Sequence, residues 1–168
     1  SAIRELFAYG MERKAQVGAD NVFDYSIGNP SVPAPPKVRE TILRLMEEDP
    51  VALHGYTPAA GDPAVRDAVA RHIRERYGVP ATPGQLYLTV GAAAAIAISL
   101  AAVTHPGDEV IVISPFFPEY STWIGMCGCE RVEVPASVPD FQIDVDAVAA
   151  AIGPKTSAII INSPNNPV

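Results

Sequence analysis

The chain has 168 residues, of which 48% are hydrophobic and 18% are charged, and its formal net charge is −7 at pH 7. This length and composition are typical of a folded globular domain with a sizeable core and exclude a disordered chain. The negative charge argues against nucleic acid or an anionic membrane surface as the main partner.

The cysteine content favours a reducing compartment. Cys127 and Cys129 are separated by one glycine, and no second pair of Cys or His residues lies nearby to complete a zinc site. A disulfide between residues two apart would be strained, so we interpret both as small apolar side chains. The sequence also shows no apolar run long enough for a bilayer and no signal-peptide core, and we expect a cytoplasmic protein.

The first part of the chain predicts helices separated by loops. A helix is expected over residues 2–17, an extended segment over 22–27, a proline-rich loop from Gly28, and a second helix from Pro36 or Lys37. Another loop covers residues 54–61. Asp62 is a good N-cap before Pro63, and Gly78 is placed to end the helix that follows, so we expect that helix over 63–77.

From residue 86 onward, strands and helices alternate. We predict strands over 86–89, 109–114, 131–134 and 156–162, and helices over 91–104, 118–126 and 145–152. Continuous apolar runs over 110–113 and 158–161 indicate strands that are buried on both faces. The pattern predicts an α/β fold: a mostly parallel sheet with helices on both faces, in three layers with right-handed crossovers, preceded by a helical and extended N-terminal segment.

Three loops carry candidate binding residues. Gly91 lies between a predicted strand and a predicted helix, where free N–H groups bind anions such as phosphate, although a simple turn explains this loop better when it is taken alone. Neither GxGxxG nor GxxxxGK[ST] is present. Phe116 and Phe117 follow the next strand, where they either stack on a planar ring or pack as a rim pair. Asn166, in an Asn-Pro turn after the last strand, is able to donate to a ligand oxygen.

These three loops, with 26–30 (Ser-Ile-Gly-Asn-Pro) and 54–58 (His-Gly-Tyr-Thr-Pro) ahead of them, resemble the class I/II (fold-type I) pyridoxal-phosphate-dependent aminotransferases. The motifs occur in the family's order, and the resemblance covers essentially the whole chain as far as Pro167. It implies that residues 1–50 form an N-terminal arm and part of a small domain. It also implies that residues 51–168 form the first part of the large domain, which binds pyridoxal 5'-phosphate (PLP).

The resemblance also implies roles for single residues at the cofactor. The backbone N–H groups of Gly91, Ala92 and Ala93 would hold the cofactor phosphate. Position 93 often carries a hydroxyl or an amide in the family, so Ala93 leaves more of this contact to the backbone. Phe117 would stack on the pyridine ring, and Asn166 would donate to the phenolic oxygen of the ring.

Two further residues would serve the partner subunit and the substrate. Tyr56 resembles the tyrosine that reaches the phosphate of the neighbouring subunit, which implies a homodimer with shared active sites. Gly28 resembles the glycine whose backbone approaches the substrate carboxylate. From the residues alone, an ordinary half-buried tyrosine and a turn glycine are the better explanations.

The family's catalytic lysine, the carboxylate on the pyridine nitrogen and the substrate-binding arginine are expected beyond the Asn-Pro motif. The chain's own lysines are Lys14, Lys37 and Lys155, and none has a suitable position: two lie on predicted helices and the third precedes a strand. The sequence is therefore expected to be an inactive fragment, and no metal site is expected because the three histidines lack ligand spacing.

The function that we expect of the parent protein is transfer of an amino group between an amino acid and a 2-oxo acid. A carbon–sulfur lyase or another fold-type I activity remains an alternative, because such enzymes bind the cofactor in the same way. A non-catalytic PLP-sensing domain of a transcription regulator is an alternative of another class and would need a DNA-binding module ahead of Ser1. Ser1 lies near the expected start of a free-standing enzyme, which favours an enzyme.

Overall fold

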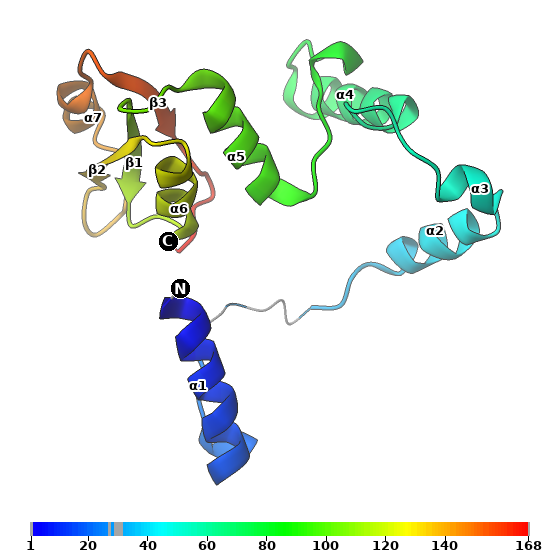
Figure 1. Ribbon diagram of the computed structural model, residues 1–168, viewed down its shortest axis with the longest axis horizontal. Helices are drawn as coiled ribbons and strands as arrows, with labels where there is room; N and C mark the ends of the chain where they lie inside the picture. The colour runs from blue at the N-terminus through cyan, green and yellow to red at the C-terminus, as the bar shows by residue number, and fades with distance from the viewer. Residues whose placement is uncertain (1, 27, 29–31, 168) are drawn as a thin grey trace. The chain divides into compact units, whose positions relative to one another are not determined.

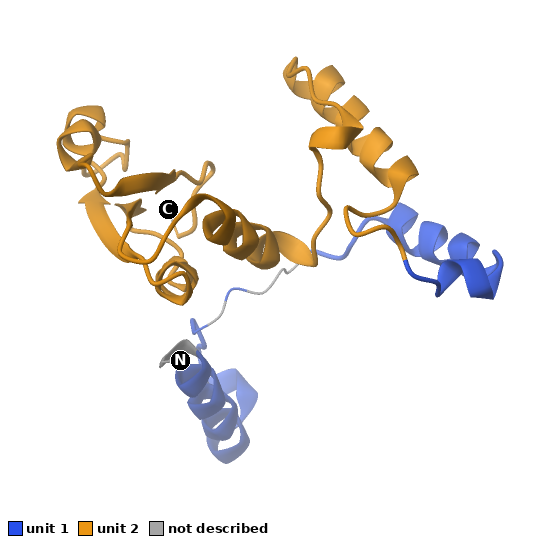
Figure 2. Ribbon diagram, turned by 45° about the horizontal axis from the view of Figure 1, so that its top comes forward, with its two compact units in different colours: residues 1–56 blue, residues 57–168 orange. Residues whose placement is uncertain are grey.

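The computed structural model describes residues 2–26, 28 and 32–167 (Figure 1). The chain divides into two compact units, residues 1–56 and residues 57–168, which Figure 2 shows in separate colours. Each unit is considered by itself. No helix within the described residues is both long enough and apolar enough to cross a membrane.

The first unit is helical. It contains α1 (Ala2–Val17), the short 3-10 helix η1 (Ala19–Asn21), α2 (Pro36–Met46) and α3 (Pro50–Leu53). The predictions of α1 and α2 are confirmed. The short helix α3 was not predicted, although its start has a clear signal, because the Asp49 side chain accepts from the N–H of Val51 at 2.9 Å. Residues 22–26 form no regular strand, and residue 27 lies outside the described residues.

A carboxylate ties α1 to the segment that follows it. Lys14 Nζ donates to Asp24 at 2.8 Å, and the hydroxyl and N–H of Ser26 donate to the same carboxylate at 2.6 and 3.1 Å. The bond from Lys14, followed by those from Ser26, holds the pKa of Asp24 well below its usual range. Gly10 is buried here, and a Cβ at this position would lie 2.9 Å from Asp24 Oδ2.

The second unit begins with a helix that its sequence delimits well. In α4 (Pro63–Tyr77), Asp62 accepts from the N–H of Val65 at 3.0 Å, and the helix ends at Gly78, whose φ is 68°. Both boundaries are as predicted. The strand predicted over 86–89 is wrong, because these residues follow the 3-10 helix η2 (Pro83–Gln85) as irregular chain. Their apolar character fits a strand, but a strand also needs a neighbouring ladder. Here a single bond from the N–H of Leu88 to Ala60 O at 3.0 Å joins them to the preceding loop.

The α/β part follows the predicted order of elements. It consists of α5 (Gly91–Val103), β1 (Glu109–Ser114), α6 (Glu119–Met126), β2 (Glu130–Pro135), α7 (Val145–Ala151) and β3 (Thr156–Ile160). The three strands form a parallel sheet in the order β2-β1-β3. The predicted α/β class and the parallel sheet are therefore confirmed.

The connections place helices on both faces of this sheet. The chain passes from β1 through α6 to β2 on one side, and then returns through α7 past β1 to β3 on the other side. Because crossovers between parallel strands are right-handed, reversing the direction moves the connecting helix to the opposite face. Figures 1 and 2 show α7 across the sheet from α5 and α6.

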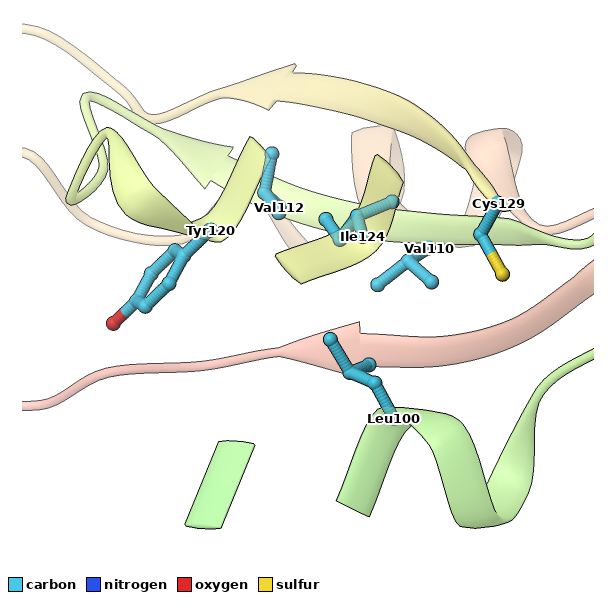
Figure 3. Close-up of a cluster of buried hydrophobic side chains, with 6 residues drawn as sticks. All are labelled: Leu100, Val110, Val112, Tyr120, Ile124 and Cys129. Carbon is cyan, nitrogen blue, oxygen red and sulfur yellow. The ribbon is translucent and has the colours of Figure 1, made fainter. Parts of the chain in front are cut away.

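The core lies between the sheet and the pair α5 and α6. Figure 3 shows its buried side chains, which are Leu100, Val110, Val112, Tyr120, Ile124 and Cys129. Side chains alternate along a strand, so the fully buried Ile111 points to the face on which α7 lies. Cys129 is part of the core and Cys127 packs against it, which agrees with their interpretation as small apolar side chains.

A second carboxylate fixes the amino edge of the sheet. Asp108 precedes β1, and its carboxylate accepts from the Ser157 hydroxyl in β3 at 2.6 Å and from the N–H of His105 at 2.8 Å. The bond from Ser157, followed by that from His105, holds the pKa of Asp108 below its usual value. This group therefore joins two neighbouring strands outside their backbone ladder.

Ile124→Ala tests the packing of α6 on the sheet. Ile124 is 1% exposed, so its truncation removes buried methyl groups and leaves a cavity. The free energy of unfolding is expected to fall by about 2–5 kcal/mol. Chemical denaturation measures this loss, with Val138→Ala, at a side chain that is 80% exposed, as the control. Equal losses in the two variants would contradict the assignment of Ile124 to the core.

Asp108→Asn tests the hydrogen bonds that the Asp108 carboxylate accepts at the amino edge. A carboxyl group whose pKa is lower in the folded state stabilises the fold above the unfolded-state pKa of about 3.9. This contribution is lost as the pH falls through the folded-state value. We expect the variant to be less stable than the wild type at pH 7, and this deficit to shrink from about pH 4 downward. Denaturant midpoints measured at several pH values report both effects. Asp67→Asn, at an exposed position on α4, is the control. A loss of stability in the Asp108 variant that does not change with pH would contradict the role assigned to the Asp108 carboxylate.

Candidate functional site

The strand order places a candidate site at the carboxyl edge of the sheet. The chain leaves β1 towards β2 and then returns past β1 to β3, so the direction of winding reverses at β1. Open α/β sheets bind ligands outside the carboxyl ends of their strands at such a reversal. Two of the predicted motifs, the aromatic loop after β1 and the asparagine loop after β3, lie at this edge.

The structure brings these two loops into direct contact. Asn165 Nδ2 donates to the carbonyl oxygen of Pro115 at 2.8 Å, although the two residues are 50 positions apart. Next to this bond is a small cavity of about 50 Å³. Its lining includes residues from both loops and from the segment after β2: Ser114, Pro115, Phe116, Phe141, Asn162 and Asn165.

The two phenylalanines of the first loop have different surroundings. Phe116 lies parallel to Tyr120, with 6.3 Å between ring centroids and 14° between planes, and the Arg131 guanidinium lies 5.1 Å from its centroid. Phe117 meets Tyr120 edge-on at 5.9 Å and Trp123 at a tilt at 6.1 Å. Phe116 is therefore held by a cation and a parallel ring, whereas the contacts of Phe117 with its aromatic neighbours are edge-on and tilted.

Asn166 is exposed in a loop that Asn162 helps to shape. In the amide orientation that gives both polar atoms of Asn162 a partner, its oxygen accepts from the N–H of Asn166 at 3.2 Å and its nitrogen donates to the carbonyl oxygen of Pro164 at 3.3 Å. The backbone of Asn166 is thus held from within the loop, and its side chain is exposed to solvent. An amide in this position is able to donate to a ligand oxygen.

The first turn of α5 has the features of an anion site. Gly91 adopts φ 80°, and its N–H donates to Thr89 O at 2.9 Å. Within the described chain no side chain caps this helix, and its first turn contains only glycine and alanine. The N–H groups of Ala92 and Ala93 therefore remain free for a ligand, and the helix dipole favours negative charge there. Because α5 packs on the core and returns through a short turn into β1, its first turn lies towards the carboxyl edge.

Tyr56 and Gly28 belong to the first unit. The Tyr56 side chain is fully exposed. Gly28 is exposed too, and a Cβ there would meet no described atom within 4 Å. The structure thus shows no steric reason for glycine at position 28. The roles of both residues remain predictions that depend on a substrate and on a second subunit.

Sequence reasoning missed Asn165. Its neighbour Asn166 was selected because the family motif marks it, whereas the contact of Asn165 with Pro115 depends on tertiary structure. Of the three lysines, Lys14 pairs with Asp24, Lys37 pairs with Glu40, and Lys155 directly precedes β3 at the amino edge. Across residues 2–26, 28 and 32–167, no three or more His, Cys, Asp or Glu side chains are grouped to hold a metal ion.

A parallel α/β sheet with a helix start and two motif loops at its carboxyl edge is typical of the class of α/β proteins that bind ligands at the carboxyl ends of their strands. Comparison with known proteins identifies the family within this class. Residues 20–168 match the family model described as aminotransferase class I and II. The chain belongs to this family.

Relatives at the level of sequence and structure agree with this assignment. The chain is 37% identical to the probable N-succinyldiaminopimelate aminotransferase DapC of Mycobacterium tuberculosis, over 96% of the chain and 40% of that protein. It is also 37% identical to the aspartate/prephenate aminotransferase of Thermus thermophilus, over 99% of the chain and 42% of that protein. A crystal structure of an aminotransferase from Eubacterium rectale matches with a TM-score of 0.92 and 50% identity, over 99% of the chain and 42% of that structure. The chain therefore spans about two fifths of the length of these relatives.

Gly91→Ala tests the turn that begins α5. An added Cβ would meet no described atom within 4 Å, so its effect comes from the left-handed backbone at φ 80°. We expect the free energy of unfolding to fall by about 1–2 kcal/mol. Calorimetry or chemical denaturation measures the change. Gly84→Ala is a matched control, since position 84 has the same open space and its φ is not positive, and this variant is expected to be neutral or slightly stabilising. Equal effects of the two substitutions would contradict the assigned strain.

Proposed function

We propose that this chain forms the cofactor-binding part of a PLP-dependent aminotransferase, which moves an amino group between an amino acid and a 2-oxo acid. The observation that carries the proposal is the convergence of two motif loops at the carboxyl edge of the sheet, joined by the bond from Asn165 to Pro115. Membership of the class I and II aminotransferase family supports it.

The residues at this edge fit the cofactor. The first turn of α5 offers free backbone N–H groups at Ala92 and Ala93, beside a turn that Gly91 makes possible, and no acidic side chain lies in that turn to repel a phosphate. Since Ala93 has no polar side-chain atom, the backbone and the helix dipole hold the phosphate at this position.

The two loops fit the ring of the cofactor. Phe117 would stack on the pyridine ring and exclude water from it, while Phe116 packs on Tyr120 and lies beneath the Arg131 guanidinium. The Asn166 amide would donate a hydrogen bond to the phenolic oxygen and so favour its charged form. When bound, PLP supplies the electron sink that makes the α-proton of an amino acid acidic.

The remaining machinery belongs to parts of the protein beyond these residues. We infer that the lysine that binds the cofactor covalently, the carboxylate for the pyridine nitrogen and the arginine for the substrate lie C-terminal to Pro167. Residues 1–50 then belong to the N-terminal arm and the small domain, and residues 51–168 to the large domain. The division of the structure into compact units after Tyr56 supports this arrangement.

We further infer a homodimer in the cytoplasm, with active sites that the subunits share. The full exposure of Tyr56 supports a contact with the phosphate of a second copy, because its ring is not used within its own unit. In the same assembly, Gly28 brings its backbone close to the substrate carboxylate. The two mapped loops leave the amino-acid side chain unspecified, so aspartate, aromatic and aliphatic donors all agree with the site.

Spectroscopy of the protein purified from its native gene tests this function. We expect a yellow protein whose visible band is abolished by borohydride, which fixes the cofactor to a lysine and raises the intact mass accordingly. Transfer of an amino group from an amino acid to 2-oxoglutarate is then measured by chromatography. A native protein that neither contains nor binds PLP would refute the proposal. Release of a thiol or sulfide together with ammonia and a 2-oxo acid from a cysteine-type substrate, without any amino acceptor, would instead identify a carbon–sulfur lyase.

A further inference from the structure

We propose that Asn165 is a positioning residue, which aligns the ring-stacking Phe117 with the ring-oxygen donor Asn166 through its hydrogen bond to the carbonyl of Pro115. The inference rests on the proposed function, since both aligned residues act on the cofactor. Asn165 itself contacts backbone and has no assigned contact with cofactor or substrate.

The position of this bond in the chain explains its influence. The acceptor, Pro115, lies two residues before Phe117, and the donor, Asn165, is the immediate neighbour of Asn166. One bond of 2.8 Å therefore sets the distance between two loops that each carry one contact to the ring. Both Asn165 and Pro115 are half-buried, so water competes with this bond less than at an exposed site.

Backbone pairing within the sheet does not join these two loops, so a side chain makes the connection. On the β2 side, β1 remains paired as far as Ser114, and the N–H of Ala136 still donates to Ser114 O at 2.8 Å. On the β3 side, the backbone ladder ends earlier, at the pair Val112 and Ile160. Beyond this point the two loops diverge around the cavity of about 50 Å³. Asn165 bridges them where the backbone no longer pairs.

The chemistry of asparagine suits this bridge. A carbonyl oxygen only accepts, so the partner must donate, and the short amide side chain supplies an N–H without a charge. Aspartate has nearly the same size but offers no donor when ionised, and it would place a negative charge against the Pro115 carbonyl. Asn165→Asp and Asn165→Ala therefore remove the bridge in two different ways.

The test uses the native protein, freed of cofactor and titrated with PLP. Asn165→Ala and Asn165→Asp are compared with wild type and with Ser163→Ala, an exposed substitution in the same loop. Three quantities are measured: the dissociation constant of PLP, the pH midpoint of the visible band of the bound cofactor, and the melting temperature of the cofactor-free protein.

We expect both Asn165 variants to weaken PLP binding roughly threefold to tenfold, as for the loss of one hydrogen bond. The pH midpoint of the visible band is expected to rise, because a misplaced Asn166 stabilises the charged ring oxygen less. Ser163→Ala should leave the dissociation constant and the midpoint unchanged. A purely structural role would lower the melting temperature without moving the pH midpoint.

The outcomes separate this inference from the proposed function. If wild type binds PLP and both Asn165 variants keep its dissociation constant and pH midpoint, the positioning role is wrong and the proposed function stands. If wild type does not bind PLP, the proposed function fails, and the role of Asn165 fails with it. Should Asn165→Ala not fold, Asn165→Asp gives the same comparison at nearly unchanged volume.

Discussion

The central position of β1 between two parallel neighbours is the constraint on which the rest of the α/β unit depends. Val110, Ile111 and Val112 are fully buried, so both faces of this strand need a cover. A right-handed crossover in each direction supplies it, with α6 on one face and α7 on the other. The same reversal places the loops after β1 and β3 side by side at one edge. The burial of three side chains and the location of the candidate site thus have a common origin.

The unequal ladders on the two sides of β1 create the room at this edge. Where pairing with β3 ends, Phe141 lines the opening, and its backbone is left-handed with φ 53°. Such a conformation is unfavourable for a bulky residue by about 1–2 kcal/mol. It is held by bonds within the loop: the N–H of Phe141 donates to Ser137 O at 2.8 Å, and the N–H of Ser137 donates to Gln142 O at 2.9 Å. The strained loop that contains Phe141 and the loop that contains Asn165 therefore border the same cavity, where the regular backbone pairing of the sheet ends.

The sequence predicted elements whose signals are local and missed features that depend on distant partners. Asp62 and Gly78 delimit α4 through their own capping geometry, and the apolar run of β1 is buried as predicted. The prediction of burial on both faces is wrong for the run of β3, where Ile159 is 39% exposed and Ile161 is 62% exposed, because β3 is an edge strand within the described sheet. Residues 86–89 carry a similar apolar signal, but a strand exists only with a paired neighbour, which no local pattern reveals. Asn165 was missed for the same reason, since its partner is 50 positions away. The family motifs marked the loops of the site, while the bond that joins them required the structure.

In the proposed phosphate site, binding of the cofactor depends on how the hydrophobic core holds α5. The alanine-rich first turn offers no side-chain donors, so in the proposed site α5 would contribute only N–H groups, whose directions are set by the axis of the helix. That axis is fixed by Ile96 and Leu100, which pack against the buried cluster of β1 and α6. A polar side chain is able to adjust its rotamer when a helix shifts, whereas a backbone N–H moves with the helix as a whole. In the proposed site, the apolar contacts of α5 would thus also orient the N–H groups that face the phosphate, although none of these contacts touches it.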